Sequence, residues 1–238
     1  MANMKTDFAG ILGGEDYDLY NLAAPHTLEM QAKVGRIAAK FVSEIKNPQV
    51  LEIGTGSGDT SAELLLNNPG IPIVSIDIEK KMIEAAKERF SQESNLHLIQ
   101  AEALSYLKEQ EGDSLDVVVS SLCLHNLQSD FRREVNKEIA RVLKTGGMFL
   151  NLDNYALDDV NAHVDSLFSQ IKAFDVYLKP EINRPDVRDE WIRHYIADDQ
   201  PGTRITESEQ REMLNDLGFK EIQFTDRVLM AVIMRSVK

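Results

Sequence analysis

Three glycines at alternate positions are the residues in this chain whose type and spacing best suit ligand binding. Gly54, Gly56 and Gly58 follow a short run of strand-forming residues, 50–53, and precede a leucine-rich helical pattern at 60–67. Glycine tolerates positive φ angles and lets another molecule approach the bare backbone. A strand, a glycine turn and a helix in this order present backbone N–H groups at the helix N-terminus, so we expect the loop to bind a ligand.

An acidic residue narrows the identity of that ligand. A second expected strand ends in Asp77, where a carboxylate suits a bidentate grip on ribose hydroxyls. Asp77 lies about 20 residues beyond Gly58, which is the spacing of a nucleoside-binding βαβ unit. Dinucleotide sites use G-x-G-x-x-G, whereas this chain has G-x-G-x-G preceded by Glu52 within the strand. The glycine spacing therefore disfavours a nicotinamide dinucleotide.

The E-x-G-x-G-x-G segment resembles the first motif of class I S-adenosylmethionine-dependent methyltransferases. Four further segments resemble later motifs of that family in the same order, at residues 77–78, 99–103, 115–127 and 141–150. Many small-molecule methyltransferases of the ubiquinone-biosynthesis type carry paired histidines after the fourth strand, where this chain has His125 followed by Asn126. Five ordered motifs are far more specific than one glycine loop.

The resemblance implies S-adenosylmethionine as the cofactor and S-adenosylhomocysteine as the product. The glycines would cradle the methionine portion, Asp77 would hold the ribose, and Ile78 and Met82 would flank the adenine. Glu102 stands where the family usually has aspartate. The full set of donor-binding residues that it implies is Glu52, Gly54, Gly56, Gly58, Asp77, Ile78, Met82, Glu102, Ala103, Ser120 and Tyr20.

His125 is the residue that we predict to take part in the chemistry. Methyl transfer from a sulfonium is an in-line displacement that needs a positioned acceptor, exclusion of water and, for some nucleophiles, a base. The unperturbed pKa of histidine, ~6.5, suits proton abstraction. We expect His125 to act as a general base or to orient the acceptor; the alternative is a histidine that only packs or forms hydrogen bonds.

Acceptor-binding residues are expected outside the glycine loop, and the predicted set is Tyr17, Asn126, Asp153, Trp191, His194 and Tyr195. Trp191 and Tyr195 are four residues apart and would share a helix face, where they could hold a planar or cationic acceptor or simply anchor a lid. Asp153 and Asn154 resemble the magnesium pair of catechol-type O-methyltransferases. We expect no metal site, because serines replace the third ligand at 120–121.

These residues must be positioned by an alternating β and α pattern. Strands are expected near 49–53, 72–76, 96–100, 115–121 and 147–152, and helices near 60–67, 80–91, 102–110 and 130–143. Such alternation predicts a Rossmann-like, doubly wound and mostly parallel sheet. We expect seven strands in all and a helical lid insertion. The last two strands, near 220–226 and 228–235, would form a C-terminal hairpin that adds an antiparallel strand to the sheet. Thr60 and Glu63 predict a capping box, and the glycines at 146–147 a helix C-terminus.

Four regions follow from this pattern. We expect an N-terminal cap segment and helix at 1–47, the donor-binding core at 48–153, a helical lid at 154–204, and a C-terminal helix and hairpin at 205–238. Residues 1–27 show little regular pattern before a helix near 27–45. We hypothesise that residues 1–30 close over the acceptor together with residues 154–204.

Composition limits the partners. The 238-residue chain carries a net charge of −13, which repels polyanions and argues against DNA and RNA. Its single cysteine, Cys123, allows no internal disulfide. The sequence shows neither a signal peptide nor a membrane span, so we expect a cytoplasmic enzyme acting on a small molecule. A homodimer is left open.

Three other functions stay open at this point. The first is a tRNA-modification relative that handles an altered S-adenosylmethionine donor, and the second is a non-catalytic partner subunit that binds the donor or nothing. The third is a nicotinamide-dependent reductase, which the glycine spacing disfavours.

Overall fold

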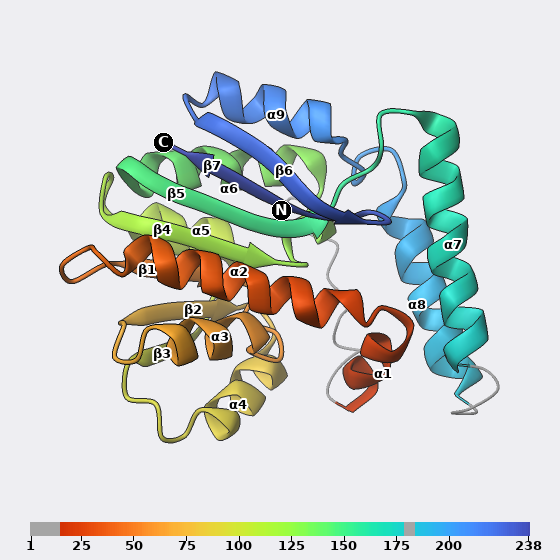
Figure 1. Cartoon of the computed structure of the whole chain (residues 1–238), viewed down its shortest axis with the longest axis horizontal. Helices are drawn as coiled ribbons and strands as arrows, with labels where there is room; N and C mark the ends of the chain where they lie inside the picture. The colour runs from red at the N-terminus through yellow and green to blue at the C-terminus, as the bar shows by residue number, and fades with distance from the viewer. Residues whose placement is uncertain (1–14, 179–183) are drawn as a thin grey trace.

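A seven-stranded sheet forms the centre of the computed structural model, which describes residues 15–178 and 184–238 (Figure 1). Its strand order is β3-β2-β1-β4-β5-β7-β6. The strands are β1 Val50–Ile53, β2 Ile73–Asp77, β3 Leu96–Gln100, β4 Leu115–Ser121, β5 Leu143–Asn154, β6 Lys220–Val228 and β7 Ala231–Val237. Strands β1 to β5 pair in parallel, and β7 runs antiparallel to β5 and β6. The predicted fold class is confirmed.

Helices cover both faces of this sheet. They are α1 Glu15–Ala23, α2 His26–Val42, α3 Asp59–Asn67, α4 Lys80–Arg89, α5 Ala103–Glu109, α6 Ser129–Val142, α7 Val160–Leu178, α8 Pro185–Asp198 and α9 Glu207–Asp216. One apolar core packs α2 and α3 on the sheet, and a second packs α5, α6 and α9 on the opposite face. Neighbouring residues of a strand point to opposite faces, so Val117 enters the first core and Val118 the second.

The described helices of the segments predicted as a lid lie at one end of the sheet, and residues 1–14 and 179–183 of those segments lie outside the described structure. Helices α1, α7 and α8 stand side by side in Figure 1, and a third apolar cluster joins them. Its buried aromatic members are Tyr20 from α1, Phe174 from α7, and Trp191 and Tyr195 from α8. Within the described residues, no helix combines the length and apolar character that crossing a bilayer would require.

The start of α3 corrects the predicted capping box. Gly58 is the N-cap in a left-handed conformation with φ of 81°, and no side chain caps the helix. Thr60 lies within the first turn and donates its hydroxyl hydrogen to Ser121 at 2.9 Å. A capping box is present instead at α9, where Thr206 and Glu209 bond each other's backbone N–H groups.

Two other local predictions are wrong. The glycines at 146–147 do not end a helix; they lie in a bulge within β5, between the residues that pair with Leu115 and Val117 of β4. The bulge is held by the chain's end, since the Gly146 N–H donates to the Lys238 carbonyl at 2.7 Å. The C-terminal hairpin turns at 229–230, two residues later than expected. Helix α1 was not predicted at all.

Candidate active site

The glycine loop joins β1 to α3 and has left-handed backbone at all three glycines. Their φ angles are 84° at Gly54, 50° at Gly56 and 81° at Gly58. A methyl group added at Gly54 would lie 2.6 Å from the side chain of Cys123, and one at Gly58 would lie 2.4 Å from the ring of Phe90. One added at Gly56 would meet nothing within 4 Å. Packing therefore requires the outer two glycines, whereas the middle one borders open space.

We expect Gly54→Ala and Gly56→Ala to differ in their effect on stability. Gly54→Ala adds a clash with Cys123 to the strain of positive φ, and should lower the free energy of unfolding by about 3 kcal/mol. Gly56→Ala adds only backbone strain, about 1 kcal/mol. Urea denaturation of both variants measures the difference, and equal losses would contradict this account of the loop.

Asp77 at the end of β2 organises this loop. One carboxylate oxygen accepts the Gly56 N–H at 2.9 Å, and the other accepts the Glu79 N–H at 2.8 Å. Burial raises the pKa of Asp77, and hydrogen bonds from backbone N–H groups, that of Gly56 foremost, partly offset the rise. The side chain thus fixes the orientation of the loop.

A cavity of about 130 Å³ lies over the loop. It is lined by Gln31, Gly54, Thr55, Gly56, Ser57, Asp59, Thr60, Asp77, Ile78, Glu79, Met82, Ser121, Leu122, Cys123, Asn126 and Leu127. We call it the donor cavity. A smaller cavity of about 70 Å³ continues from it past Asp77 and Ile78 to Ala101, Glu102 and Ala103. A nucleoside attached to an amino-acid tail has this extended shape, with a polar end at the loop.

Several residues predicted to contact the donor do not line either of these cavities. Glu52 lies beneath the loop, where one carboxylate oxygen accepts hydrogen bonds from Ser61 and from Ser75. Gly58 faces the ring of Phe90. The hydroxyl of Ser120 donates to the Ile53 carbonyl at 2.9 Å, because successive strand residues point to opposite faces, and Ser121 lines the cavity instead.

The other predicted site residues that need comment are Tyr20, Asn126, Glu102 and Tyr17. Tyr20 packs in the aromatic cluster, away from the donor cavity. Asn126, predicted to contact the acceptor, lines the donor cavity. Glu102 lines the smaller cavity, but its carboxylate also caps α5 through the N–H groups of Leu104 and Ser105. The side chain of Tyr17 in α1 lies outside the described part of the structure.

Glu52 predicts a pH dependence of stability. Burial raises its pKa from 4.5 to about 7. The folded protein then holds a proton that the unfolded chain releases above about pH 4.5, so this contribution to stability is present below that pH and is lost as pH rises to about 7. The loss is about 3 kcal/mol. Urea denaturation of wild type and Glu52→Gln at pH 5 and 8 tests this. The free energy of unfolding should fall less between the two pH values in the variant than in wild type, and equal falls would contradict the raised pKa of Glu52.

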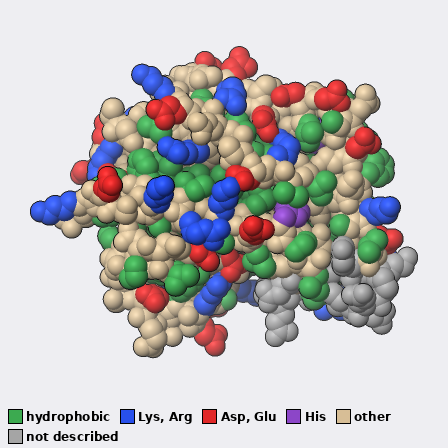
Figure 2. Space-filling view, viewed as in Figure 1, with side chains coloured by type: hydrophobic (Ala, Val, Ile, Leu, Met, Phe, Trp, Pro, Cys, Tyr) green, Lys and Arg blue, Asp and Glu red, His purple; other side chains and the backbone are tan. Residues whose placement is uncertain are grey.

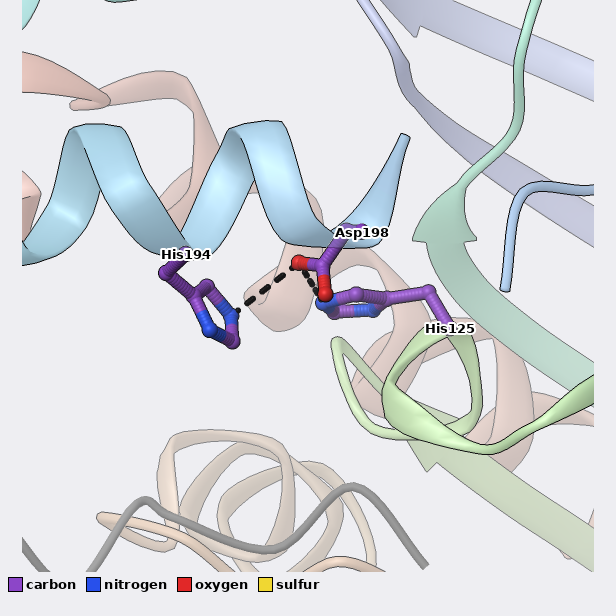
Figure 3. A group of neighbouring side chains, drawn as sticks. All are labelled: His125, His194 and Asp198. Carbon is purple, nitrogen blue, oxygen red and sulfur yellow. Dashed lines mark ion pairs between the residues drawn. The ribbon is translucent and has the colours of Figure 1, made fainter. Parts of the chain in front are cut away.

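His125 lies in a short 3-10 helix, η1 Leu124–Asn126, directly after β4. Its Nδ1 is hydrogen-bonded to the buried carboxylate of Asp153 at the end of β5, and its Nε2 lies 3.6 Å from Oδ2 of Asp198 in α8. The same oxygen of Asp198 lies 3.1 Å from Nε2 of His194 (Figure 3). The structure therefore brings together three predicted site residues, His125, Asp153 and His194. The fourth member of the group, Asp198, was not predicted from the sequence.

Asp198 could have been found from its spacing. It follows His194 by four residues on the same helix, where side chains at i and i+4 are neighbours. A second pair was also missed, in which His163 Nε2 lies 2.7 Å from Asp199 Oδ1. The expected lid placed the insertion near His125, but the sequence did not indicate which of its side chains would meet the histidine.

Two small cavities, each about 20 Å³, border His125 on the side of α7 and α8. One of them is lined by Tyr20, Leu122, His125, Asn154, Trp191, His194 and Tyr195. Leu122 lines both this cavity and the donor cavity, so it separates the two. The aromatic residues pack on one another: the ring centroids of Tyr20 and Trp191 are 4.5 Å apart, and the Tyr20 and Tyr195 hydroxyl oxygens are 2.9 Å apart.

Comparison with known proteins finds a family match over the core of the chain. Residues 50–147 match the methyltransferase domain family. The malonyl-[acyl-carrier protein] O-methyltransferase of Paenibacillus sp. is 32% identical over 54% of this chain and 50% of that protein. This chain therefore spans about half the length of that relative. The ubiquinone/menaquinone biosynthesis C-methyltransferase of Geotalea daltonii is 27% identical over 50% of each chain.

Two further relatives match over most of their length. The carboxy-S-adenosyl-L-methionine synthase of Campylobacter fetus is 22% identical over 87% of this chain and 83% of that protein. A putative methyltransferase, solved in complex with the Trm112 methyltransferase activator of Haloferax volcanii, is 18% identical to this chain. The match covers 99% of this chain and 97% of that protein, with a TM-score of 0.63. At 18% identity, the structural likeness shows that the two proteins share a fold and nothing more. The predicted resemblance to class I methyltransferases is confirmed by the family match.

Proposed function

We propose that this chain, whose residues 50–147 match the methyltransferase domain family, transfers a methyl group from S-adenosylmethionine to an O, N or C atom of a small molecule. The donor cavity carries this proposal. It lies at the C-terminal ends of β1, β2 and β4, where ligands bind in open α/β sheets. There the Asp77 carboxylate both meets the cavity and holds the Gly56 backbone.

The donor would lie along the two connected cavities. The loop would hold the methionine portion, Asp77 the ribose hydroxyls, and Ile78 and Met82 the adenine. Glu102 and Ala103 would meet the adenine edge in the smaller cavity. Glu52 supports this arrangement from below, because its hydrogen bonds tie β1 to Ser61 of α3 and Ser75 of β2.

The acceptor would lie beyond Leu122, beside His125. Because Asp153 accepts a hydrogen bond at Nδ1 of His125, the other ring nitrogen is directed toward the acceptor side. His125 would take a proton from the acceptor or hold it in line with the sulfonium methyl group. Residues 1–30 and 154–204 would form the lid that excludes water, with Trp191 and Tyr195 as its aromatic wall.

The charge of the chain supports a small acceptor. Lysine and arginine side chains are interspersed with acidic ones on the face shown in Figure 2, and the net charge is −13. This balance disfavours nucleic acids as partners. We propose a cytoplasmic enzyme, acting alone or as a homodimer, on a metabolite with an ionisable hydroxyl or carbonyl-activated carbon.

Release of S-adenosylhomocysteine tests the proposal. Purified protein would be incubated with S-adenosylmethionine and panels of hydroxy acids, phenols, quinols and β-dicarbonyl compounds, and the product would be quantified by mass spectrometry. At least one panel should raise its release above the rate without acceptor. The proposal fails if bound donor is never consumed.

One relative supports a second candidate, an altered donor. The carboxy-S-adenosyl-L-methionine synthase matches over more of its length than the O-methyltransferase does. Mass spectrometry of the ligand released from the purified protein distinguishes the two, because the carboxylated donor is heavier than S-adenosylmethionine by one CO₂.

A further inference from the structure

Three side chains from two distant segments converge beside the two small cavities that border His125. His125 comes from η1 after β4, and His194 and Asp198 come from successive turns of α8 (Figure 3). One potential ligand atom from each of these residues lies within 4.8 Å of those from the other two. All three side chains are largely buried, with exposed fractions of 8%, 12% and 10%. We call them the His-His-Asp cluster.

We propose that the His-His-Asp cluster binds one divalent transition-metal ion, through Nε2 of His125, Nε2 of His194 and Oδ2 of Asp198. Two imidazoles and one carboxylate are the ligand type of catalytic zinc sites and of non-haem iron sites. This set of ligands is different from the Asp153–Asn154 pair considered in the sequence analysis. The serines at 120–121, which argued against a metal at that pair, do not bear on it.

The distances already approach those of a bound site. Metal–ligand bonds of about 2.0–2.2 Å place the ligand atoms of one ion roughly 3 to 3.5 Å apart. The Asp198 oxygen lies 3.1 Å from the nitrogen of His194 and 3.6 Å from that of His125. The two histidine nitrogens lie within 4.8 Å of each other and would approach further on binding the ion. Helix α8 keeps His194 and Asp198 on one face because they are four residues apart.

The surroundings of His125 also fit a metal ligand. Metal-binding histidines usually donate their second ring N–H to a carboxylate, which fixes the tautomer and raises the basicity of the other nitrogen. Asp153 fills this position at Nδ1 of His125. Asp153 is itself held by the amide of Asn151 at 3.2 Å, and that amide also donates to the Tyr155 hydroxyl at 2.8 Å. The buried network thus keeps Nε2 of His125 directed at the cluster.

The ion would define the class of acceptor. Three protein ligands leave coordination positions open for an oxygen of the substrate, whose proton becomes more acidic on a divalent ion. This role rests on the proposed methyl transfer and implies a hydroxyl-bearing or enolisable acceptor. His125 would then orient the acceptor through the ion. Binding of the ion itself does not depend on the activity.

Cobalt binding tests the site. The full chain would be treated with a chelator, dialysed and titrated with Co²⁺, whose visible absorption reports nitrogen and oxygen ligands directly. Wild type should bind one equivalent. His194→Ala and Asp198→Asn should each weaken binding at least about 100-fold, because each removes a direct ligand, and Asp153→Asn should weaken it about 10- to 100-fold. His97→Gln, which removes an exposed histidine on β3, should leave binding unchanged.

A different result would overturn the proposal. If wild type takes up no stoichiometric Co²⁺, or if His194→Ala binds it as tightly as wild type does, the cluster is a hydrogen-bonded network and holds no ion. Circular dichroism of each variant shows that loss of binding is not loss of fold. Titration of the metal-free protein with S-adenosylmethionine separates the two proposals: donor binding without Co²⁺ binding contradicts only the metal site, and Co²⁺ binding without donor binding contradicts only the methyl-transfer function.

Discussion

Replacement of Asp77 by alanine is expected to weaken S-adenosylmethionine binding by at least about 100-fold. The carboxylate accepts the backbone N–H groups of Gly56 and Glu79, at 2.9 and 2.8 Å, so its loss releases the loop. It also removes the proposed contact with the ribose. A bidentate contact with the ribose would make two hydrogen bonds to a charged group, each contributing about 1.5–3 kcal/mol, and losing both corresponds to at least this factor. Isothermal titration calorimetry measures the change.

Glu84→Gln is the matched control for this experiment. Glu84 is an exposed acid on α4, paired with Lys80 at 3.4 Å, and its replacement removes the same charge without touching the donor cavity. Its donor affinity should equal that of wild type. An Asp77→Ala variant that keeps its melting temperature and binds the donor within about threefold of wild type would contradict the assigned role of Asp77.

Replacement of His125 by glutamine is expected to lower kcat by about 100- to 10,000-fold. The imidazole borders the acceptor side and does not line the donor cavity, so donor affinity should change little. The expected signature is therefore a loss of turnover with an unchanged dissociation constant for S-adenosylmethionine. Single-turnover kinetics with a saturating acceptor, together with calorimetry, separate the two quantities.

The same substitution at His97 provides the control. His97 is exposed on β3, at the sheet edge, and His97→Gln should retain wild-type kcat. Near-full activity in His125→Gln would show that neither a base nor a histidine ligand is needed, and positioning by the lid and donor site would then suffice.

The glycine loop and the acid beside it were predictable from sequence because their signals are local. Gly54, Gly56 and Gly58 have positive φ angles, and Asp77 ends the second strand. Each of these features can be recognised from a few consecutive residues. The sheet followed from alternation of strands and helices. What failed here was orientation: β4 is buried on both faces, so its pattern cannot tell that Ser121 faces the cavity and Ser120 does not.

The acceptor side depends on contacts between distant segments. Asp198 meets His125 across 73 positions of the chain, which no local pattern encodes. Helix α1 has little amphipathic character of its own, and Tyr20 is buried by Trp191 and Phe174 of the insertion. The bulge at 146–147 is likewise stabilised by pairing with the C-terminal strand, which overrides the tendency of glycine to end a helix.

Calorimetric titration of the intact chain with S-adenosylmethionine is the most direct test of the central claim. The donor cavity predicts one site per chain, competition by S-adenosylhomocysteine and no binding of NADH. Absence of heat at millimolar donor, with the protein folded, would contradict the claim that this cavity binds a methyl donor.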